Sequence, residues 1–178
     1  MINKIHNEDC FDTMAKMEDN SIDLVITSPP YNGLANKNMY IVVGVEHGDI
    51  TKPYKRYDEY QDDKTTEGYL DWSVKLFNEY DRVLKPNRPI LYNFSYNSNE
   101  PMLPFWLVNE IYNNTPFMVV DTIVWKKPKN FPNFISQNKL SRKWEFVFVL
   151  CRKDEIKTFE IKELEEEYGQ VNIDLSDG

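Results

Sequence analysis

The tetrapeptide at 28–31 has the residue types in this sequence that best suit chemistry on an amino group. Its members are Ser28, Pro29, Pro30 and Tyr31, and they follow an apolar run at 22–26 that predicts a buried strand. Two prolines cannot continue the hydrogen-bond ladder of a sheet, so the strand is expected to end in a stiff tip. Because proline fixes φ and lacks an N–H, the carbonyls of Ser28 and Pro29 remain acceptors beside a hydroxyl and an aromatic ring. The sequence therefore predicts a pocket for an amino group on a flat ring.

This Ser-Pro-Pro-Tyr tip resembles the catalytic motif of DNA methyltransferases that methylate N4 of cytosine or N6 of adenine. The resemblance implies S-adenosylmethionine as cofactor and DNA as partner, with the target base flipped out of the duplex. Ser28 and the Pro29 carbonyl would hold the two N–H groups of the amine, and Tyr31 would stack on the base. Ser-Pro-Pro-Tyr favours cytosine over adenine by the same resemblance. The alternative is that the prolines only end a strand and that Tyr31 is a partly buried aromatic residue.

Three further segments extend the resemblance in the same order along the chain. Arg82–Pro86 resembles the link from helix to strand in these enzymes, and the segments 125–130 and 144–150 resemble their paired late strands. Several motifs in the right order are much less expected by chance than one tetrapeptide. We therefore expect the chain to be a member of this family, and an unrelated α/β domain is the structural alternative.

The elements that position the tip alternate along the chain. We expect a short strand and turn at 4–10, a short helix that includes Phe11 and Met14, helices at 68–85 and 103–112, and strands at 89–94, 117–125 and 144–150. This order predicts an α/β fold, a partial Rossmann-like S-adenosylmethionine-dependent methyltransferase fold with a mostly parallel sheet and a late antiparallel strand pair. The domain is expected to span 1–153, with a long loop at about 32–67, before an acidic tail at 154–178.

Asp9 has two interpretations. A carboxylate just before a helix commonly caps its N-terminus, which is the structural explanation. The methyltransferase resemblance implies that Asp9 faces the cofactor, as the acid of a Gly-Asp-Cys-like segment, although Glu8 stands where the family has glycine.

The net charge of −8 is distributed unevenly. The acidic tail carries nine acids and two lysines, whereas the stretch from Thr122 to Trp144 has six basic residues and no acid. These residues are Lys126, Lys127, Lys129, Lys139, Arg142 and Lys143, and aromatic residues lie between them. The pattern predicts a surface that binds DNA phosphates, and the alternative is an ordinary solvated basic loop.

The remaining features place the chain in a broad class. The sequence has no apolar stretch long enough for a membrane span and no signal-peptide pattern, so we expect a cytoplasmic protein with no membrane partner. Cys10 and Cys151 lack disulfide or zinc spacing and are expected to be buried apolar residues. His6 and His47 have no ligand-spaced partners, so no metal site is predicted.

The sequence has six glycines but no Gly-x-Gly. Rossmann-like cofactor sites need a glycine-rich turn, which the resemblance places towards the C-terminus of such enzymes. The chain is therefore expected to be truncated before that motif, and to need a second polypeptide or a homodimer to complete the sheet. A catalytically inactive relative, acting as a DNA-binding or methyltransferase-partner subunit, is the functional alternative. A protein-glutamine methyltransferase is disfavoured because that family has Asn at the Ser28 position.

Overall fold

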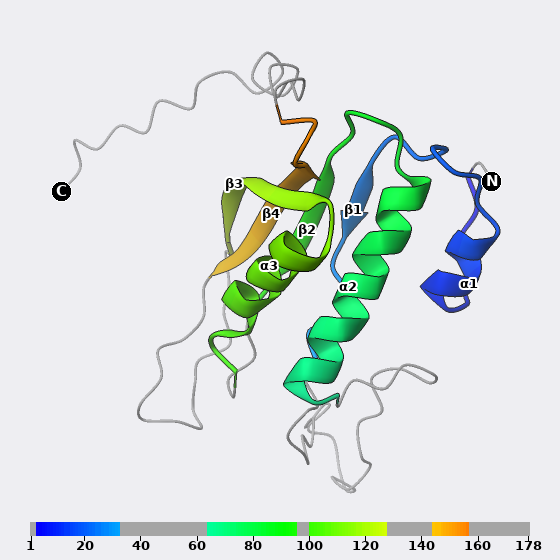
Figure 1. The fold of residues 1–178 in the computed structure, drawn as a ribbon. Coiled ribbons are helices and arrows are strands. Elements are labelled where there is room, and N and C mark those ends of the chain that lie inside the picture. The colour runs from blue at the N-terminus through cyan, green and yellow to red at the C-terminus, as the bar shows by residue number, and fades with distance from the viewer. Residues whose placement is uncertain (1–2, 33–63, 96–99, 128–143, 157–178) are drawn as a thin grey trace, which may run out of the picture.

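The computed structural model describes residues 3–32, 64–95, 100–127 and 144–156, and these ranges form a sheet covered by helices (Figure 1). The described strands are β1 (Val25–Thr27), β2 (Ile90–Phe94), β3 (Phe117–Lys126) and β4 (Trp144–Arg152), and the helices are α1 (Cys10–Ala15), α2 (Thr66–Val83) and α3 (Leu103–Asn114). No helix in these ranges is long and apolar enough to cross a membrane. The elements predicted between 68 and 150 are all present, with ends displaced by at most two residues.

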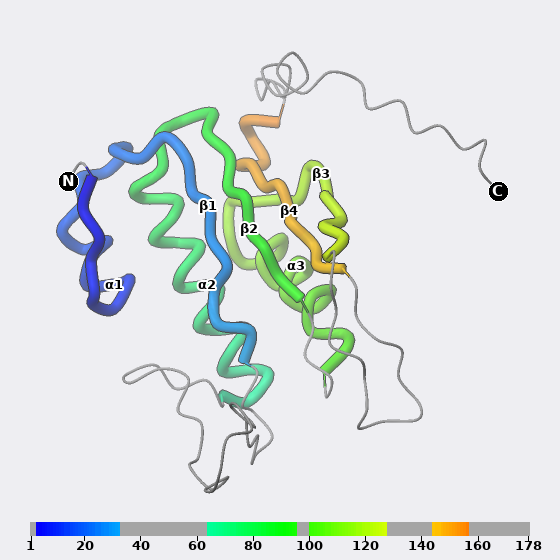
Figure 2. Tube along the Cα trace, turned by 180° about the vertical axis from the view of Figure 1, so that it is seen from behind, coloured from blue at the N-terminus to red at the C-terminus, as the bar shows by residue number. Residues whose placement is uncertain are grey.

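The sheet has the strand order β1-β2-β4-β3. β1 pairs in parallel with β2, whereas β4 is antiparallel to both of its neighbours. Three strands therefore run in one direction and β4 alone is reversed, which confirms the predicted α/β fold with a mostly parallel sheet and a late antiparallel pair. The C-terminal ends of β1, β2 and β3 lie together with the start of β4 at one end of the sheet (Figure 2).

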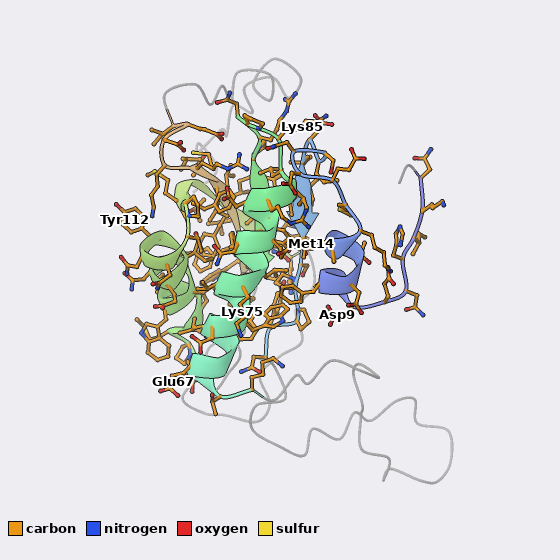
Figure 3. All side chains as sticks on the ribbon, turned by 45° about the vertical axis from the view of Figure 1, so that its right-hand side comes forward. Asp9, Met14, Glu67, Lys75, Lys85 and Tyr112 are labelled. Carbon is orange, nitrogen blue, oxygen red and sulfur yellow. The ribbon has the colours of Figure 1, made fainter. Side chains whose placement is uncertain are left out.

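Helix α2 lies between α1 and α3 on one face of the sheet (Figure 3). It begins at the N-cap Thr65, whose side chain accepts a hydrogen bond from the Gly68 N–H. Its buried residues recur every three or four positions and are Tyr69, Ser73, Leu76, Phe77, Tyr80 and Val83. The helix ends before Pro86, and Asn87 turns the chain with a φ of 57°.

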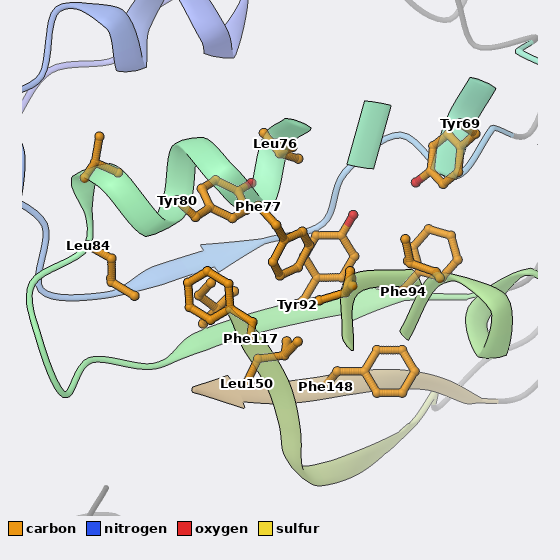
Figure 4. Close-up of a cluster of buried hydrophobic side chains, with 14 of the residues drawn as sticks. Tyr69, Leu76, Phe77, Tyr80, Leu84, Tyr92, Phe94, Phe117, Phe148 and Leu150 are labelled. Atoms are coloured by element: carbon orange, nitrogen blue, oxygen red, sulfur yellow. The ribbon is translucent and has the colours of Figure 1, made fainter. Parts of the chain in front are cut away.

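An aromatic cluster joins α2 to β2 and forms the centre of the core (Figure 4). Phe77 lies 5.1 Å from Tyr92 and 5.8 Å from Phe117 between ring centroids, and Tyr69 stacks on Phe94 at 6.0 Å. All five side chains are fully buried. Such pairs contribute about 0.5–1.5 kcal/mol each beyond their area burial, so the cluster fixes α2 firmly on β2.

The prediction of a buried strand at 22–26 is wrong in two respects. The strand starts later, at Val25, and the apolar side chains of Leu24 and Ile26 are 43% and 70% exposed. Leu24 and Ile26 are two positions apart and point to the same face of the sheet, whereas Val25 points to the opposite face, which packs on the core beneath α2 and α3 (Figure 2). Ile22 still joins the fold through an isolated parallel bridge to Leu84.

Two expectations for the N-terminal region also differ from the structure. Residues 3–9 form no strand, and Ile5 is fully exposed, because no other described strand pairs with this segment. Cys151 is buried as expected, but Cys10 is exposed because it lies at the first turn of α1. Both cysteines are free.

Arg152, at the end of β4, ties that strand to the C-terminus of α2. Its guanidinium is almost fully buried and donates to Asp81 Oδ1 at 2.5 Å. It also donates to the backbone carbonyls of Asp81, Leu84 and Lys85 at 2.7, 2.8 and 3.1 Å. These carbonyls include groups that the end of a helix leaves without intrahelical partners. Arg152 therefore serves as a C-terminal cap supplied from a distant strand.

We expect Arg152→Ala to lower the free energy of unfolding by about 2–4 kcal/mol, because three buried or part-buried carbonyls lose their donor at once. Urea denaturation measures the change. Arg88→Ala is the control: its exposed ion pair with Asp23, at 3.5 Å, is expected to contribute less than about 1 kcal/mol. Equal losses for the two variants would contradict the capping role.

Candidate active site

A tyrosine of α2 holds the tip that follows β1. The Tyr69 hydroxyl donates to the Pro30 carbonyl at 2.7 Å, and the Tyr69 ring is fully buried. Pro29 is buried, whereas Ser28 is exposed. The tip therefore has a fixed backbone and presents its serine to solvent.

Asn32 ends the tip and fixes its exit. Its φ of 53° lies in the left-handed region, which Asn tolerates better than most residues. The buried Asn32 side chain donates to the Lys64 carbonyl at 2.8 Å and accepts from the Lys64 N–H at 2.9 Å. Most of the predicted loop, residues 33–63, lies outside the described residues, but its two ends are joined by these bonds.

A chain of hydrogen bonds links the tip to the two neighbouring strands. The hydroxyls of Ser28 and Tyr31 lie 2.7 Å apart, and the Tyr31 hydroxyl donates to Asn93 Oδ1, also at 2.7 Å. Asn93, on β2, donates from Nδ2 to the Phe146 carbonyl of β4 at 2.9 Å. The Tyr31 ring contacts Phe94 edge to face, with centroids 5.0 Å apart. The structure thus brings the hydroxyls of Ser28 and Tyr31 into contact, and the roles of both residues towards a base remain predictions.

Asp9 caps α1. Its Oδ1 accepts from the Phe11 N–H at 2.8 Å, which confirms the structural interpretation of this residue. Burial raises the pKa of the Tyr80 hydroxyl, and the nearby Cys10 thiol raises it further. A hydrogen bond with the Thr27 side chain lowers this pKa, so Tyr80 interacts with residues of both α1 and β1. Asp9 is exposed, and its role towards a cofactor remains a prediction.

The basic stretch is described only in part. Lys126 lies opposite Trp144 where β3 and β4 pair, at the same end of the sheet as the tip. Lys127 forms an ion pair with Glu145, and its Nζ lies 6.0 Å from the centroid of Trp125. Lys129, Lys139, Arg142 and Lys143 lie outside the described residues. Glu145 comes directly after the acid-free stretch, and its carboxylate pairs with Lys127. Sequence reasoning missed this pairing.

Sequence reasoning also missed Asn93 and Tyr69. Asn93 had a usable signal, because it is a polar residue in the otherwise apolar strand at 90–94. Tyr69 had none: it occupies a core position of α2 like Phe77, and only the structure shows its hydroxyl at the Pro30 carbonyl.

In this sheet β4 is reversed and lies between β2 and β3, and Ser-Pro-Pro-Tyr follows the end of β1. These features define a methyltransferase-type α/β domain. The family model described as DNA methylase, of the N6 and N4 type, matches residues 22–177. The chain therefore belongs to the family of amino-methylating DNA methyltransferases.

Individual relatives agree with this assignment. The Type II methyltransferase M.BglII of Bacillus subtilis is 26% identical over 161 residues, which cover 89% of this chain and 38% of that protein. M.SfiI of Streptomyces fimbriatus is 29% identical over 165 residues, covering 82% and 35% of the two chains. The chain thus spans less than half the length of these relatives.

A solved structure shows the same fold. The PvuII DNA methyltransferase (cytosine-N4-specific) matches with a TM-score of 0.56 at 18% identity, over 81% of this chain and 47% of that one.

We expect Tyr69→Phe to lower the free energy of unfolding by about 1 kcal/mol, because the Pro30 carbonyl loses its donor while the ring packing is kept. Urea denaturation measures the change. Tyr112→Phe is the control, since Tyr112 is 52% exposed, and it is expected to have almost no effect. An equally small effect at Tyr69 would show that its hydroxyl does not stabilise the tip.

Proposed function

We propose that this chain provides the amine-binding site of a DNA methyltransferase, which transfers a methyl group from S-adenosylmethionine to the exocyclic amine of a flipped base. The observation that carries the proposal is the exposed Ser28 hydroxyl, on a tip held rigidly by Tyr69 and Asn93. The first residue of the motif favours N4 of cytosine over N6 of adenine, by resemblance to the family's motifs.

The tip supplies two hydrogen-bond acceptors for the reaction. Ser28 Oγ and the Pro29 carbonyl hold the two amine N–H groups, which orients the nitrogen lone pair and favours a pyramidal, nucleophilic nitrogen. Bound S-adenosylmethionine would supply the methyl group, towards which these two acceptors would direct the nitrogen lone pair, and the nitrogen would then lose one proton to solvent. Stacking on Tyr31 offsets part of the cost of flipping the base.

The cofactor fits this chain only in part. S-adenosylmethionine supplies an activated methyl group on a sulfonium, and its ribose hydroxyls need acceptors. Asp9 offers an exposed carboxylate at the N-terminus of α1, but the sequence has no Gly-x-Gly turn for the close backbone approach. We propose that a further segment or a partner chain supplies that turn, pairs with β1, which is an edge strand of the described sheet, and covers the exposed side chains of Leu24 and Ile26.

Calorimetric titration of S-adenosylmethionine into the 178-residue chain tests this division of roles. Absence of binding would place the glycine turn on another segment. Binding at micromolar affinity would show that Asp9 and the tip suffice, and would contradict the need for a partner.

We expect Ser28→Ala to lower the rate of methyl transfer about 10²-fold, because the amine loses one of its two acceptors. The rate is measured in the cofactor-competent assembly, which is this chain together with the segment or partner that completes the S-adenosylmethionine site. Transfer of a labelled methyl group to DNA, followed by nucleoside mass spectrometry, measures both the rate and the base. Ser21→Ala is the control, since Ser21 lies in the turn before β1 and its hydroxyl donates to the nearby Glu18 carbonyl. DNA binding without any methyl transfer would favour the inactive-subunit alternative instead.

We expect Lys126→Ala to weaken DNA binding and to reduce the dependence of log affinity on log salt by about one unit, because one phosphate contact is lost. Lys127→Ala is expected to have a smaller effect, since its ammonium is already paired with Glu145. Fluorescence anisotropy at several salt concentrations compares the two variants. A larger loss at Lys127 would contradict this ranking and the proposed use of the surface.

A further inference from the structure

Asn93 lies one strand away from the tip, yet its orientation determines the direction of every hydrogen bond that leads to Ser28. The Phe146 carbonyl can only accept, so the Asn93 amide must turn its Nδ2 towards β4. Its Oδ1 then faces the Tyr31 hydroxyl at 2.7 Å. The amide orientation is therefore set by the backbone of β4.

The same logic passes to the next two residues. Oδ1 can only accept, so the single proton of the Tyr31 hydroxyl is donated to Asn93. That proton is then not available for Ser28, whose Oγ lies 2.7 Å from the Tyr31 oxygen. The Ser28 hydroxyl must therefore be the donor in this bond.

A serine hydroxyl has one proton and two acceptor lone pairs. With its proton committed to Tyr31, Ser28 Oγ presents only lone pairs towards the exposed side of the tip. An exocyclic amine needs an acceptor there, and a donor would repel it. A chain of hydrogen bonds in a part-buried site also polarises each member, which makes the terminal oxygen a better acceptor.

We propose that Asn93 is a positioning residue that, through Tyr31, fixes the Ser28 hydroxyl as a hydrogen-bond acceptor for the substrate amine. This inference rests on the proposed function, because the amine is its substrate group. It adds to the roles predicted from the motif: Tyr31 orients the serine proton in addition to stacking on the base.

A double-mutant cycle in the cofactor-competent assembly tests the relay. Asn93→Leu and Tyr31→Phe are each expected to lower methyl transfer about tenfold or more, because either change leaves the Ser28 proton free to point at the amine. The double variant is expected to be no worse than Tyr31→Phe alone, since Asn93 acts only through the hydroxyl that this change removes. Losses that multiply would overturn the inference.

Asn93→Asp is the matched variant. It keeps an acceptor for the Tyr31 hydroxyl, although it replaces the N–H directed at Phe146 by a carboxylate oxygen, so it is expected to retain clearly more activity than Asn93→Leu. Thermal unfolding of each variant identifies any general loss of structure. Activity of Asn93→Asp as low as that of Asn93→Leu, at equal stability, would show that the acceptor is not what matters.

A spectroscopic readout makes the test independent of catalysis. The ¹³Cζ resonance of labelled Tyr31, assigned by its absence in Tyr31→Phe, reports what the hydroxyl donates to. We expect this resonance to shift in Asn93→Leu and to shift less in Asn93→Asp. No shift in Asn93→Leu would overturn the relay whatever the activity. A shift in a protein that transfers no methyl group under any condition would support the relay and refute the proposed function alone.

Discussion

The parallel pairing of β1 with β2 is the constraint on which the candidate site depends. It consists of three residue pairs, of which the last, Thr27 with Tyr92, is next to the tip. Since so short a ladder cannot hold a tip without backbone donors at its prolines, side chains from other elements complete it. Tyr69 bonds the tip from α2, and Asn93 bonds it from β2 and connects it to β4. Four elements thus determine where one serine hydroxyl points.

The core and the candidate site share residues in this protein. Phe94 contacts Tyr31 on one side and stacks on Tyr69 on the other, and Tyr69 carries the hydroxyl that binds Pro30. Rings in a close-packed interior are confined to few rotamers, so the tip inherits the rigidity of the cluster around α2. Rigid support of this kind is what an oriented reaction needs, because small displacements of a reacting group reduce the rate strongly. Changes to these aromatic residues are therefore expected to affect folding and the geometry of the candidate site together.

Local patterns predicted most of the described elements, because helical spacing in α2 and the apolar runs of β2 and β4 are visible in sequence. The order of the strands could not be predicted in the same way, since it depends on pairings between distant segments. The placement of β4 inside the sheet is nevertheless explained by its residues: Phe148 to Arg152 is buried throughout, whereas β3 is exposed from Asp121 onwards and suits an edge. The Ser-Pro-Pro-Tyr tip was visible for its chemistry. Its supports were not visible, because Tyr69 looks like any core aromatic residue and the hydroxyl that donates to Asn93 lies 62 positions before it.

The two bonds between Asn32 and Lys64 have an evolutionary consequence. They close the chain on itself immediately after the tip, so that whatever lies between these residues leaves and re-enters the domain at one point. The entropic cost of a flexible closed segment rises by only about 0.6 kcal/mol for each doubling of its length. Insertions, deletions or exchanges of this segment can therefore accumulate with little effect on the serine and tyrosine beside it. Such a joint allows the length of this segment to differ between related chains while the geometry of the candidate site stays the same.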